Sequence, residues 1–252
     1  MIVRKTPEQI EKMAAAGRIL TRCLRMLTAK ARAGVTTGEL DLAAEKFIRS
    51  QSAEPAFKGY RGFPGSICTS PNSMVVHGIP GPYELKRGDL LSIDVGVIKE
   101  GWIADAAITL PIGPVSREAR KLLEVTKAAL FSGTEQMRSG NRLSDVSAAI
   151  QRAVEIEGFS VIRNLVGHGI GREMHEDPQV PNFGEPGKGP VLEEGTVLAI
   201  EPMVNAGGAL VRMGDDGWAV YSQDGSLAAH FEFTIAVTAN GPRILTPWHE
   251  DG

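Results

Sequence analysis

The chain has 252 residues, ordinary apolar and charged fractions, and a net charge of −3. A chain of this length can bury one large core, and its slight acidity argues against nucleic-acid binding. No apolar run approaches the roughly 20 residues that a membrane span needs, and the first residues lack the apolar core of a secretory signal. Two cysteines, Cys23 and Cys68, suit a reducing compartment. We therefore expect one cytoplasmic domain over residues 1–252.

The first 50 residues predict two amphipathic helices. Residues 6–9 (Thr-Pro-Glu-Gln) provide an N-cap, a proline in the first turn and a glutamine at the capping-box position, and an apolar stripe follows to about Ala31. Residues 36–39 (Thr-Thr-Gly-Glu) offer a second capping box, for a helix that ends near Ser50. The next segment, to about residue 82, is rich in glycine, proline and serine and is expected to be mostly loop.

Residues 90–110 predict a β-hairpin that buries two acids. Both of its strands are apolar and β-branched, yet Asp94 lies inside the first and Asp105 inside the second. A two-residue loop at positions 99–100 would place these aspartates directly opposite each other, and a bulge at Gly101 would change the register. Facing buried carboxylates repel each other and lose hydration, at a cost of roughly several kcal/mol. Neither strand contains lysine or arginine, so a divalent metal ion is the natural charge to lie between them. One such aspartate alone would more often be a strand-end acid bonded to backbone.

The rest of the chain continues as helices, loops and strands. Ser116 caps a third predicted helix that Gly140 stops, and a fourth helix ends at Gly158. A glycine-rich segment (GHGIG) at 167–171 then begins a long loop that reaches Pro190. Strands are expected at residues 66–69, 74–77, 160–164, 196–204 and 229–237.

The second half of the chain repeats the order of the first. The tripeptide His-Gly-Ile occurs at 77–79 and again at 168–170, and residues 85–97 align with residues 192–204. This alignment places Asp94 on Glu201, and Asp105 then corresponds to Glu232. An internal duplication of approximately residues 6–110 and 116–238 predicts two halves related by a pseudo-twofold axis, with a shared site between them.

Four acids and one histidine are the candidate metal ligands. They are Asp94, Asp105, His168, Glu201 and Glu232. An oxygen-rich set with one nitrogen suits Mn, Fe, Co or Zn. Five protein ligands are too many for one catalytic ion that must also hold water, whereas two ions roughly 3.5–4 Å apart can share them. Because a cation makes bound water more acidic, the implied reaction is hydrolysis of an amide or ester, with a nearby carboxylate moving the proton.

Motifs along the whole chain carry a resemblance to a known family. They are KTPEQIEKM, VVHGIP, IDVGV, GHGIGREMHEDPQV, IEPMVNAG, FEFT and ILT. With them the chain resembles the type I methionine aminopeptidases, metallopeptidases of the pita-bread fold. The resemblance implies an α+β fold of two pseudo-twofold-related halves, with a central curved antiparallel sheet covered by two pairs of helices.

The resemblance also implies roles for individual residues. The five candidate ligands match the family's ligands to two metal ions, with Asp105 and Glu232 bridging and Glu201 also handling protons. His77 and His175 match the histidines that contact substrate and stabilise the tetrahedral intermediate, although a histidine in a loop is more often simply solvated. The family's apolar specificity pocket falls on Tyr60, Phe63, Cys68 and Trp218.

The implied function is removal of the N-terminal methionine from nascent proteins and peptides, with a preference for a small second residue. We expect a monomer with transient ribosome contact, and with no nucleic-acid specificity or membrane association. One alternative is a proline-specific aminopeptidase or dipeptidase of the same fold, which generally carries a sizeable additional N-terminal domain. Another is a metal-free pita-bread interaction module, which typically lacks several of the ligands.

Four positions depart from the family pattern. Ala106 follows the second aspartate where threonine or serine is usual, and Met174 stands where phenylalanine is common. His230 replaces a usual glutamine, and Phe233 replaces a histidine after the last glutamate. None of these changes removes a ligand. Each bears on the hydrogen bonding around the metal site, and so on metal affinity, rate and specificity.

Overall fold

The structure, a computed structural model, describes residues 2–250, so the predicted domain of residues 1–252 extends past both ends of that range. The described chain contains four α-helices and a single 3₁₀ turn. They are α1 (Pro7–Lys30), α2 (Thr37–Ser50), η1 (Tyr60–Gly62), α3 (Arg117–Glu135) and α4 (Leu143–Glu155). None of the helices in this range is long and apolar enough to cross a membrane.

The helix starts follow the predicted capping chemistry. The Thr6 hydroxyl accepts a hydrogen bond from the Gln9 N–H (3.3 Å), and the Gln9 side chain accepts one from the Thr6 N–H (3.0 Å). Thr36 and Glu39 form the same reciprocal pair at the start of α2. These boxes satisfy N–H groups that have no partner within the helix, so local sequence alone sets where both helices begin.

The strands form four antiparallel sheets. The first has the order β1-β4-β2, with β5 paired to β4, and the second has the order β15-β14-β9-β7-β8. Two smaller sheets have the orders β13-β10-β6 and β11-β12-β3. The bounds in the first half are β1 (Glu54–Pro55), β2 (Cys68–Pro71), β3 (Met74–Val76), β4 (Leu90–Lys99) and β5 (Trp102–Pro111). Those in the second half are β6 (Ser160–Val161), β7 (Val166–Gly169), β8 (Glu176–Pro181), β9 (Val197–Ile200), β10 (Met203–Asn205), β11 (Val211–Met213), β12 (Val220–Ser222), β13 (Ala228–His230), β14 (Phe233–Thr238) and β15 (Gly241–Ile244).

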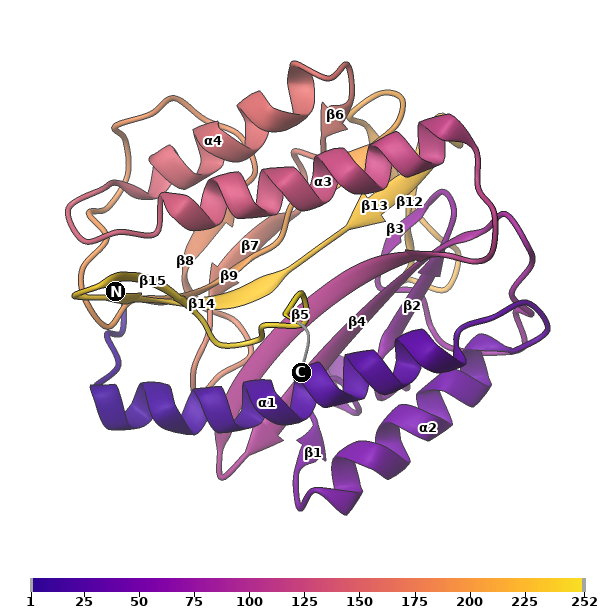
Figure 1. The fold of residues 1–252 in the computed structure, drawn as a ribbon, viewed down its shortest axis with the longest axis horizontal. Helices are drawn as coiled ribbons and strands as arrows, with labels where there is room; N and C mark the ends of the chain where they lie inside the picture. The colour runs from indigo at the N-terminus through magenta and orange to yellow at the C-terminus, as the bar shows by residue number, and fades with distance from the viewer. Residues whose placement is uncertain (1, 251–252) are drawn as a thin grey trace.

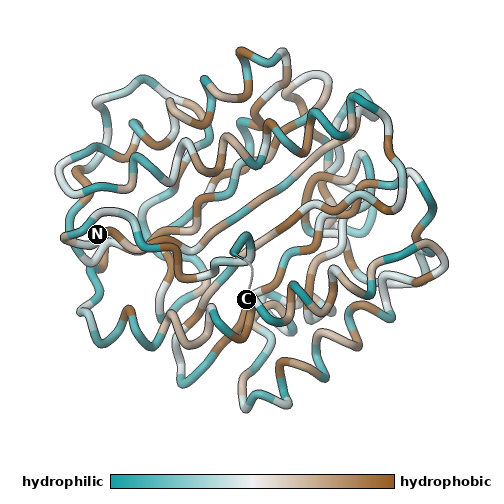
Figure 2. Tube along the Cα trace, in the orientation of Figure 1, coloured by the Kyte–Doolittle hydropathy of each residue, from teal (hydrophilic) through white to brown (hydrophobic). Residues whose placement is uncertain are grey.

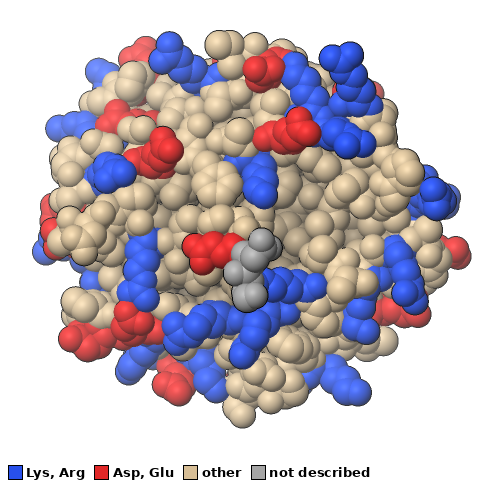
Figure 3. Space-filling model, in the orientation of Figure 1, with Lys and Arg blue, Asp and Glu red and all other residues tan. Residues whose placement is uncertain are grey.

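Two helix pairs cover the strands, one pair for each half. Figure 1 shows α1 with α2 along one half and α3 with α4 along the other, with β5 and β14 running between them. Apolar and polar residues alternate along these helices (Figure 2), as expected where one face of each helix is buried. On the outer face the two signs of charge are interspersed (Figure 3), which fits the small net charge.

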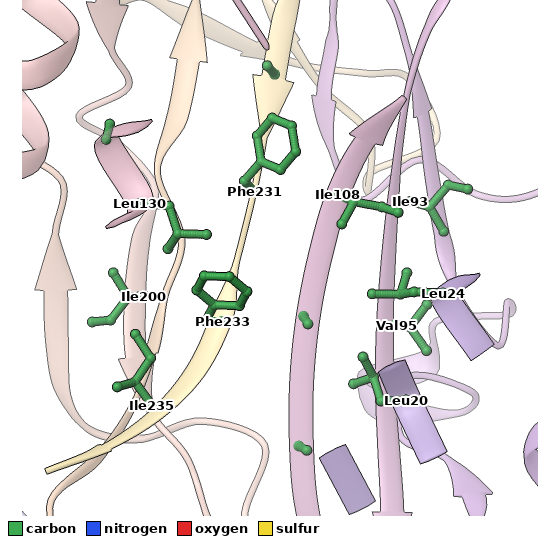
Figure 4. Packing of buried hydrophobic residues seen from close by; sticks show 14 of the residues in the cluster. Leu20, Leu24, Ile93, Val95, Ile108, Leu130, Ile200, Phe231, Phe233 and Ile235 are labelled. Carbon is green, nitrogen blue, oxygen red and sulfur yellow. The ribbon is translucent and has the colours of Figure 1, made fainter. Parts of the chain in front are cut away.

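The main core lies between the helices and the strands of both halves. Figure 4 shows Leu20 and Val95 among the side chains of the first half, and Leu130, Phe233 and Ile235 among those of the second. All belong to one buried cluster that continues across both halves. The core therefore fixes the two halves against each other and with them the strands that carry the predicted ligands.

The contacts around the helix pairs recur between the halves. In the first half the Gly34 N–H donates to the Leu85 carbonyl (2.9 Å), and the Leu85 N–H donates back to a residue beside Gly34. In the second half Gly140 and Leu192 make the same donation (3.0 Å), and Leu192 again donates back to the residue after the glycine. An internal duplication of the chain would produce this recurrence, and it stays a prediction.

A row of hydrogen bonds joins β5 of the first half to β13 and β14 of the second. The Thr234 hydroxyl accepts from the Asp105 N–H (2.9 Å) and donates to the Asp105 carbonyl (2.8 Å). The Thr109 hydroxyl bonds in the same way to the N–H and carbonyl of His230, both at 2.8 Å. Between them the Glu232 N–H donates to a β5 carbonyl. Two threonine hydroxyls thus replace backbone pairing where the halves meet.

The structure corrects several sequence predictions. The hairpin turn lies at Glu100 and Gly101, because both have positive φ (52° and 74°), as a two-residue hairpin turn requires. Asp94 therefore pairs with Ala107, not with Asp105 as predicted, and this shift of two residues leaves both aspartates on one face. The predicted strands at 196–204 and 229–237 are each interrupted in the middle. The strand predicted at 160–164 is shorter, and the one predicted at 66–69 is shifted to 68–71. Six strands were not predicted: β1, β7, β8, β11, β12 and β15.

Candidate active site

The two aspartates reach the site from the centre of the β4–β5 hairpin. Asp94 pairs with Ala107, while Asp105 pairs with Gly96, so the two acids are diagonal neighbours on one face of the sheet. A Cβ at Gly96 would lie 2.7 Å from the Phe57 ring, which shows how closely the segment after β1 packs against this sheet. The Asp105 side chain is only 5% exposed.

The two glutamates stand where the second-half strands break. Glu201 directly follows β9, and Pro202 separates it from β10. Glu232 directly precedes β14, and its side chain is buried. The β9–β14 register pairs Ile200 with Phe233, so each glutamate extends by one residue beyond the end of the ladder. Both carboxylates leave the sheet at the same level, toward the β4–β5 hairpin.

His168 on β7 completes the group, and its tautomer follows from its contacts. Its Nδ1 lies 2.9 Å from the Gly169 carbonyl, which can only accept, so Nδ1 carries the proton. The unprotonated Nε2 is 3.6 Å from Glu201 Oε1 and 3.9 Å from Asp105 Oδ2. This is the arrangement of a metal-binding imidazole, whose second nitrogen is fixed by a carbonyl.

The donor set fits a divalent metal ion. Asp105, His168 and Glu232 each offer one ligand atom within 4.8 Å of the others, all buried. One oxygen each of Asp94, Asp105 and Glu232 is buried and has no hydrogen-bond partner among the described residues. Buried polar atoms without partners are costly, so a cation that binds them would relieve the strain. Asp94 and Glu201 lie outside the compact three-residue group but border the same space.

The electrostatics of the site also favour a cation. Burial raises the pKa of Asp94 to about 6 and that of Glu201 to about 8. Burial and the neighbouring carboxylates hold the pKa values of Asp105 and Glu232 well above their usual range. Burial lowers the pKa of His168 to about 3, so its imidazole is neutral and able to bind metal. Without a metal ion, the cluster would hold protons at neutral pH.

The acids form one wall of a cavity of about 180 Å³, and apolar side chains form another. All eleven predicted site residues line it. They are Tyr60, Phe63, Cys68, His77, Asp94, Asp105, His168, His175, Glu201, Trp218 and Glu232. The Phe63 and Trp218 rings meet edge to face, with centroids 5.1 Å apart. Such a surface suits an unbranched apolar side chain.

The two non-ligand histidines are exposed, in contrast to His168. The His175 ring stacks on Tyr60, whose hydroxyl lies 2.8 Å from His175 Nδ1. Its centroid is also 4.2 Å from that of His168. His77 has a positive φ of 61°, a strained conformation for a non-glycine residue that places its ring at the cavity.

Three further residues line the cavity that sequence reasoning did not assign to it. They are Phe57, Arg61 and Met174. The aromatic spacing 57, 60, 63 was a usable signal for Phe57. Arg61 is exposed, has a φ of 49°, and lies over the Tyr60 ring at 5.3 Å. Among the described residues around the cavity, it is the only lysine or arginine.

The four departures from the family pattern fall in different surroundings. Met174 is a cavity wall, while Ala106 and Phe233 are fully buried in the main core. Phe233 packs on Trp248, with ring centroids 4.8 Å apart. His230 is also buried, and its Nε2 lies 3.5 Å from Glu201 Oε2. Only Met174 and His230 therefore touch the site directly.

Comparisons with known proteins agree with this geometry. Residues 11–239 match the model of metallopeptidase family M24. The chain is 54% identical over 246 residues to a methionine aminopeptidase of Clostridium perfringens, covering 98% of this chain and 99% of the relative. It is 51% identical to methionine aminopeptidase 1 of Bacillus subtilis, with the same coverage. A solved methionine aminopeptidase from Rickettsia prowazekii superposes with a TM-score of 0.96 at 42% identity, covering 98% of this chain and all of that one.

The chain therefore belongs to metallopeptidase family M24 and has its pita-bread fold. It is a hydrolase of the aminopeptidase class, and its full-length relatives are bacterial methionine aminopeptidases. A prolidase from Pyrococcus furiosus is also similar in fold, with a TM-score of 0.80. That likeness is at 23% identity and spans 65% of the prolidase chain, so it speaks for the fold alone.

Proposed function

We propose that this enzyme hydrolytically removes the N-terminal methionine from nascent proteins and peptides, using two divalent metal ions and preferring a small second residue. The observation that carries the proposal is the cavity with one acidic and one apolar wall. The acidic wall would hold the metal ions that hydrolysis needs, and the flexible thioether of an N-terminal methionine suits the aromatic wall around Phe63 and Trp218.

The metal requirement rests on the donor set. Asp105, His168 and Glu232 would hold one ion, and Asp94 and Glu201 would supply the further donors that a second ion needs. When bound, divalent cations lower the pKa of water and polarise a carbonyl, which is the chemistry that amide hydrolysis needs. Co, Mn, Fe and Zn all suit such a set.

The protein side chains supply the remaining steps. Glu201, whose carboxylate lines the cavity beside His168, is the residue we expect to take a proton from water and hand it to the departing amine. We expect His77 and His175, which are exposed and line the cavity, to hydrogen-bond the peptide carbonyl as it becomes tetrahedral. Tyr60 fixes the orientation of His175 through the bond to Nδ1, which leaves Nε2 for the substrate.

The small-residue preference would follow from the size of the cavity. At about 180 Å³ it has room for a methionine side chain and little beyond. A bulky second residue must then lie against the cavity rim, where Arg61, His77 and His175 are close.

Because one chain contributes all five ligands, we propose a monomer. Nascent substrates further imply a cytoplasmic enzyme that meets the ribosome transiently.

Peptide hydrolysis tests this proposal. Met-Ala-Ser should be cleaved by the metal-loaded enzyme, chelation should abolish the cleavage, and one of the four candidate ions should restore it. A peptide that begins Met-Lys should be spared, and its cleavage at a similar rate would refute the second-residue preference. Preference for an Xaa-Pro bond without methionine would favour the proline-specific alternative. Metal analysis of protein purified without added ions would give the number and identity of the ions.

A further inference from the structure

A buried ion pair lies outside the site but directly behind one of its histidines. Lys5, in the segment before α1, has a side chain only 2% exposed, and its Nζ lies 2.6 Å from Glu176 Oε2. The same Nζ donates to the Val3 carbonyl at 2.9 Å. The Glu176 side chain is 11% exposed and begins β8, next to His175. A buried charge pair is costly to form and costlier to break, so its place in the fold calls for an explanation.

Glu176 organises the turn that carries His175. Its Oε1 accepts hydrogen bonds from the backbone N–H groups of Arg172 (2.9 Å) and Glu173 (3.3 Å). One carboxylate therefore closes the turn with Oε1 and binds Lys5 with Oε2. Charge-assisted bonds of this kind are stronger than neutral ones and hold a loop in one geometry.

Two glycines make room for the Lys5 segment. A Cβ at Gly171 would lie 2.6 Å from Lys5 Cε and 2.6 Å from Glu176 Oε1. A Cβ at Gly195 would lie 2.5 Å from the Lys5 carbonyl oxygen, and the Lys5 N–H donates to the Gly195 carbonyl at 2.7 Å. The segment before α1 thus lies in a close-fitting socket made by the second half of the chain.

The other side of the turn is held by the β4–β5 hairpin. The Ile103 N–H donates to the Gly171 carbonyl at 2.9 Å, and the Arg172 guanidinium lies 4.5 Å over the Trp102 ring. His175 is therefore placed by three separate elements: the hairpin, the N-terminal segment through Glu176, and Tyr60 through its hydroxyl.

We propose that Lys5 and Glu176 are positioning residues for catalysis, which hold the turn at residues 171–175 so that the His175 ring faces the cavity. Neither side chain touches the cavity, so both act through His175. The expected effect on kcat rests on the proposed function of His175, whereas the effect on the position of its ring does not. Because His175 is expected to act on the tetrahedral state, loss of its position should lower kcat far more than it changes KM.

The kinetic test compares a buried and an exposed charge on the same segment. Lys5→Met should lower kcat for Met-Ala-Ser by about tenfold or more with KM within about twofold. Arg4→Met removes the neighbouring charge, which pairs with Glu193 on the surface, and should leave both constants within about twofold. Equal effects of the two variants, or an unchanged kcat in folded Lys5→Met, would overturn the proposal.

A second background separates positioning from general destabilisation. In a His175→Ala enzyme, Lys5→Met should change kcat by less than about twofold, because the group it positions is gone. Its effect on Tm should be the same in both backgrounds. A full additional loss of kcat in the His175→Ala enzyme would show that the ion pair acts by another route, and would overturn the proposal.

Two further measurements keep the test decisive. If Lys5→Met alone does not fold, the double variant Lys5→Met/Glu176→Gln replaces it. This variant removes both charges and keeps a side-chain oxygen that can accept from the turn, so it should fold and have a kcat near that of the unsubstituted enzyme. A kcat that stays low in the folded double variant counts against the proposal.

NMR of histidine ring nitrogens in isotope-labelled protein needs no substrate and follows all five histidines. The His175 signals, identified by their loss in His175→Ala, should move in Lys5→Met and stay in Arg4→Met. Unmoved signals would refute the positioning role even if the proposed activity also failed.

Discussion

The stability of the metal-free protein should fall as the pH rises from 6.5 to 8. Glu201 has a pKa of about 8 in the folded chain against an ordinary value of 4.5, because burial disfavours its charged form. Its folded form therefore binds a proton that the unfolded chain has already lost. The stability from this carboxyl is fully present below pH 4.5 and is lost as the pH rises through 8.

The size of the effect follows from that window. Each pH unit between the two pKa values corresponds to about 1.4 kcal/mol, so the rise from 6.5 to 8 should remove roughly 2 kcal/mol of the contribution of Glu201. For a chain of this size that loss lowers Tm by roughly 4–8 °C. Starting at pH 6.5 excludes the contribution of the buried histidines to the pH dependence. Burial lowers the pKa of His168 to about 3, so this residue makes the folded chain more stable as the pH rises, but only up to about 6.5, the ordinary pKa of histidine.

Thermal unfolding in chelator at pH 6.5 and at pH 8 measures this directly. The Glu201→Gln protein should lose the roughly 2 kcal/mol that this carboxyl contributes, and the raised pKa values of Asp105 and Glu232 should leave it a shallower slope. Glu185→Gln on the surface should keep the full difference. With a divalent ion present the trend should reverse, because the ion binds the deprotonated cluster of the folded chain. A chelated wild type as stable at pH 8 as at 6.5, or a Glu201→Gln protein with the full slope, would refute this account of the acidic cluster.

Three substitutions test other parts of the argument. Thr234→Val leaves the buried Asp105 N–H without a hydrogen-bond acceptor, so the free energy of unfolding in urea should drop by about 1–3 kcal/mol. An unchanged urea midpoint would show that the hydroxyl does not help to join the halves. Phe233→Ala empties a fully buried position and should cost about 3–5 kcal/mol in the same titration, and a loss under about 1 kcal/mol would contradict its place in the core. Tyr60→Phe removes the bond to His175 and should lower kcat for Met-Ala-Ser by about threefold to tenfold, whereas full activity would show that stacking alone orients the ring.

The helices were the most predictable part of the fold, because their signals are local. Thr6 and Thr36 cap helices with groups only three residues away, and the apolar stripes follow within the same helices. The hairpin turn was misplaced by one residue, although Gly101 is the glycine that a turn with two positive φ values favours. The error left the site prediction intact, since a register shift of two residues keeps side chains on the same face.

The strand breaks at Glu201 and Glu232 could not be predicted from pattern alone. Each stretch is a continuous apolar run with one acid in it, which favours a single strand. What interrupts the pairing is tertiary: the Glu232 N–H leaves its own sheet to bond the Ala107 carbonyl of the other half. The ion pair of Lys5 and Glu176 could not be predicted either. The two residues are 171 positions apart, and nothing in the motifs that contain them, KTPEQIEKM and GHGIGREMHEDPQV, indicates that they pair.

These breaks explain why the acids lie at the boundary between the halves. Within a continuous ladder, the backbone N–H of Glu232 would pair inside its own sheet and would make no bond to the other half. By bonding across to β5, which Thr234 and Thr109 hold on either side, the chain turns both glutamates toward the hairpin that carries Asp94 and Asp105. Neither half supplies more than two of the four acids, and each half alone would leave its pair exposed. Docking of the halves buries Asp105 and Glu232 and leaves Asp94 and Glu201 partly buried beside them. The same contacts that complete the core therefore create the charge cluster that a metal ion would neutralise.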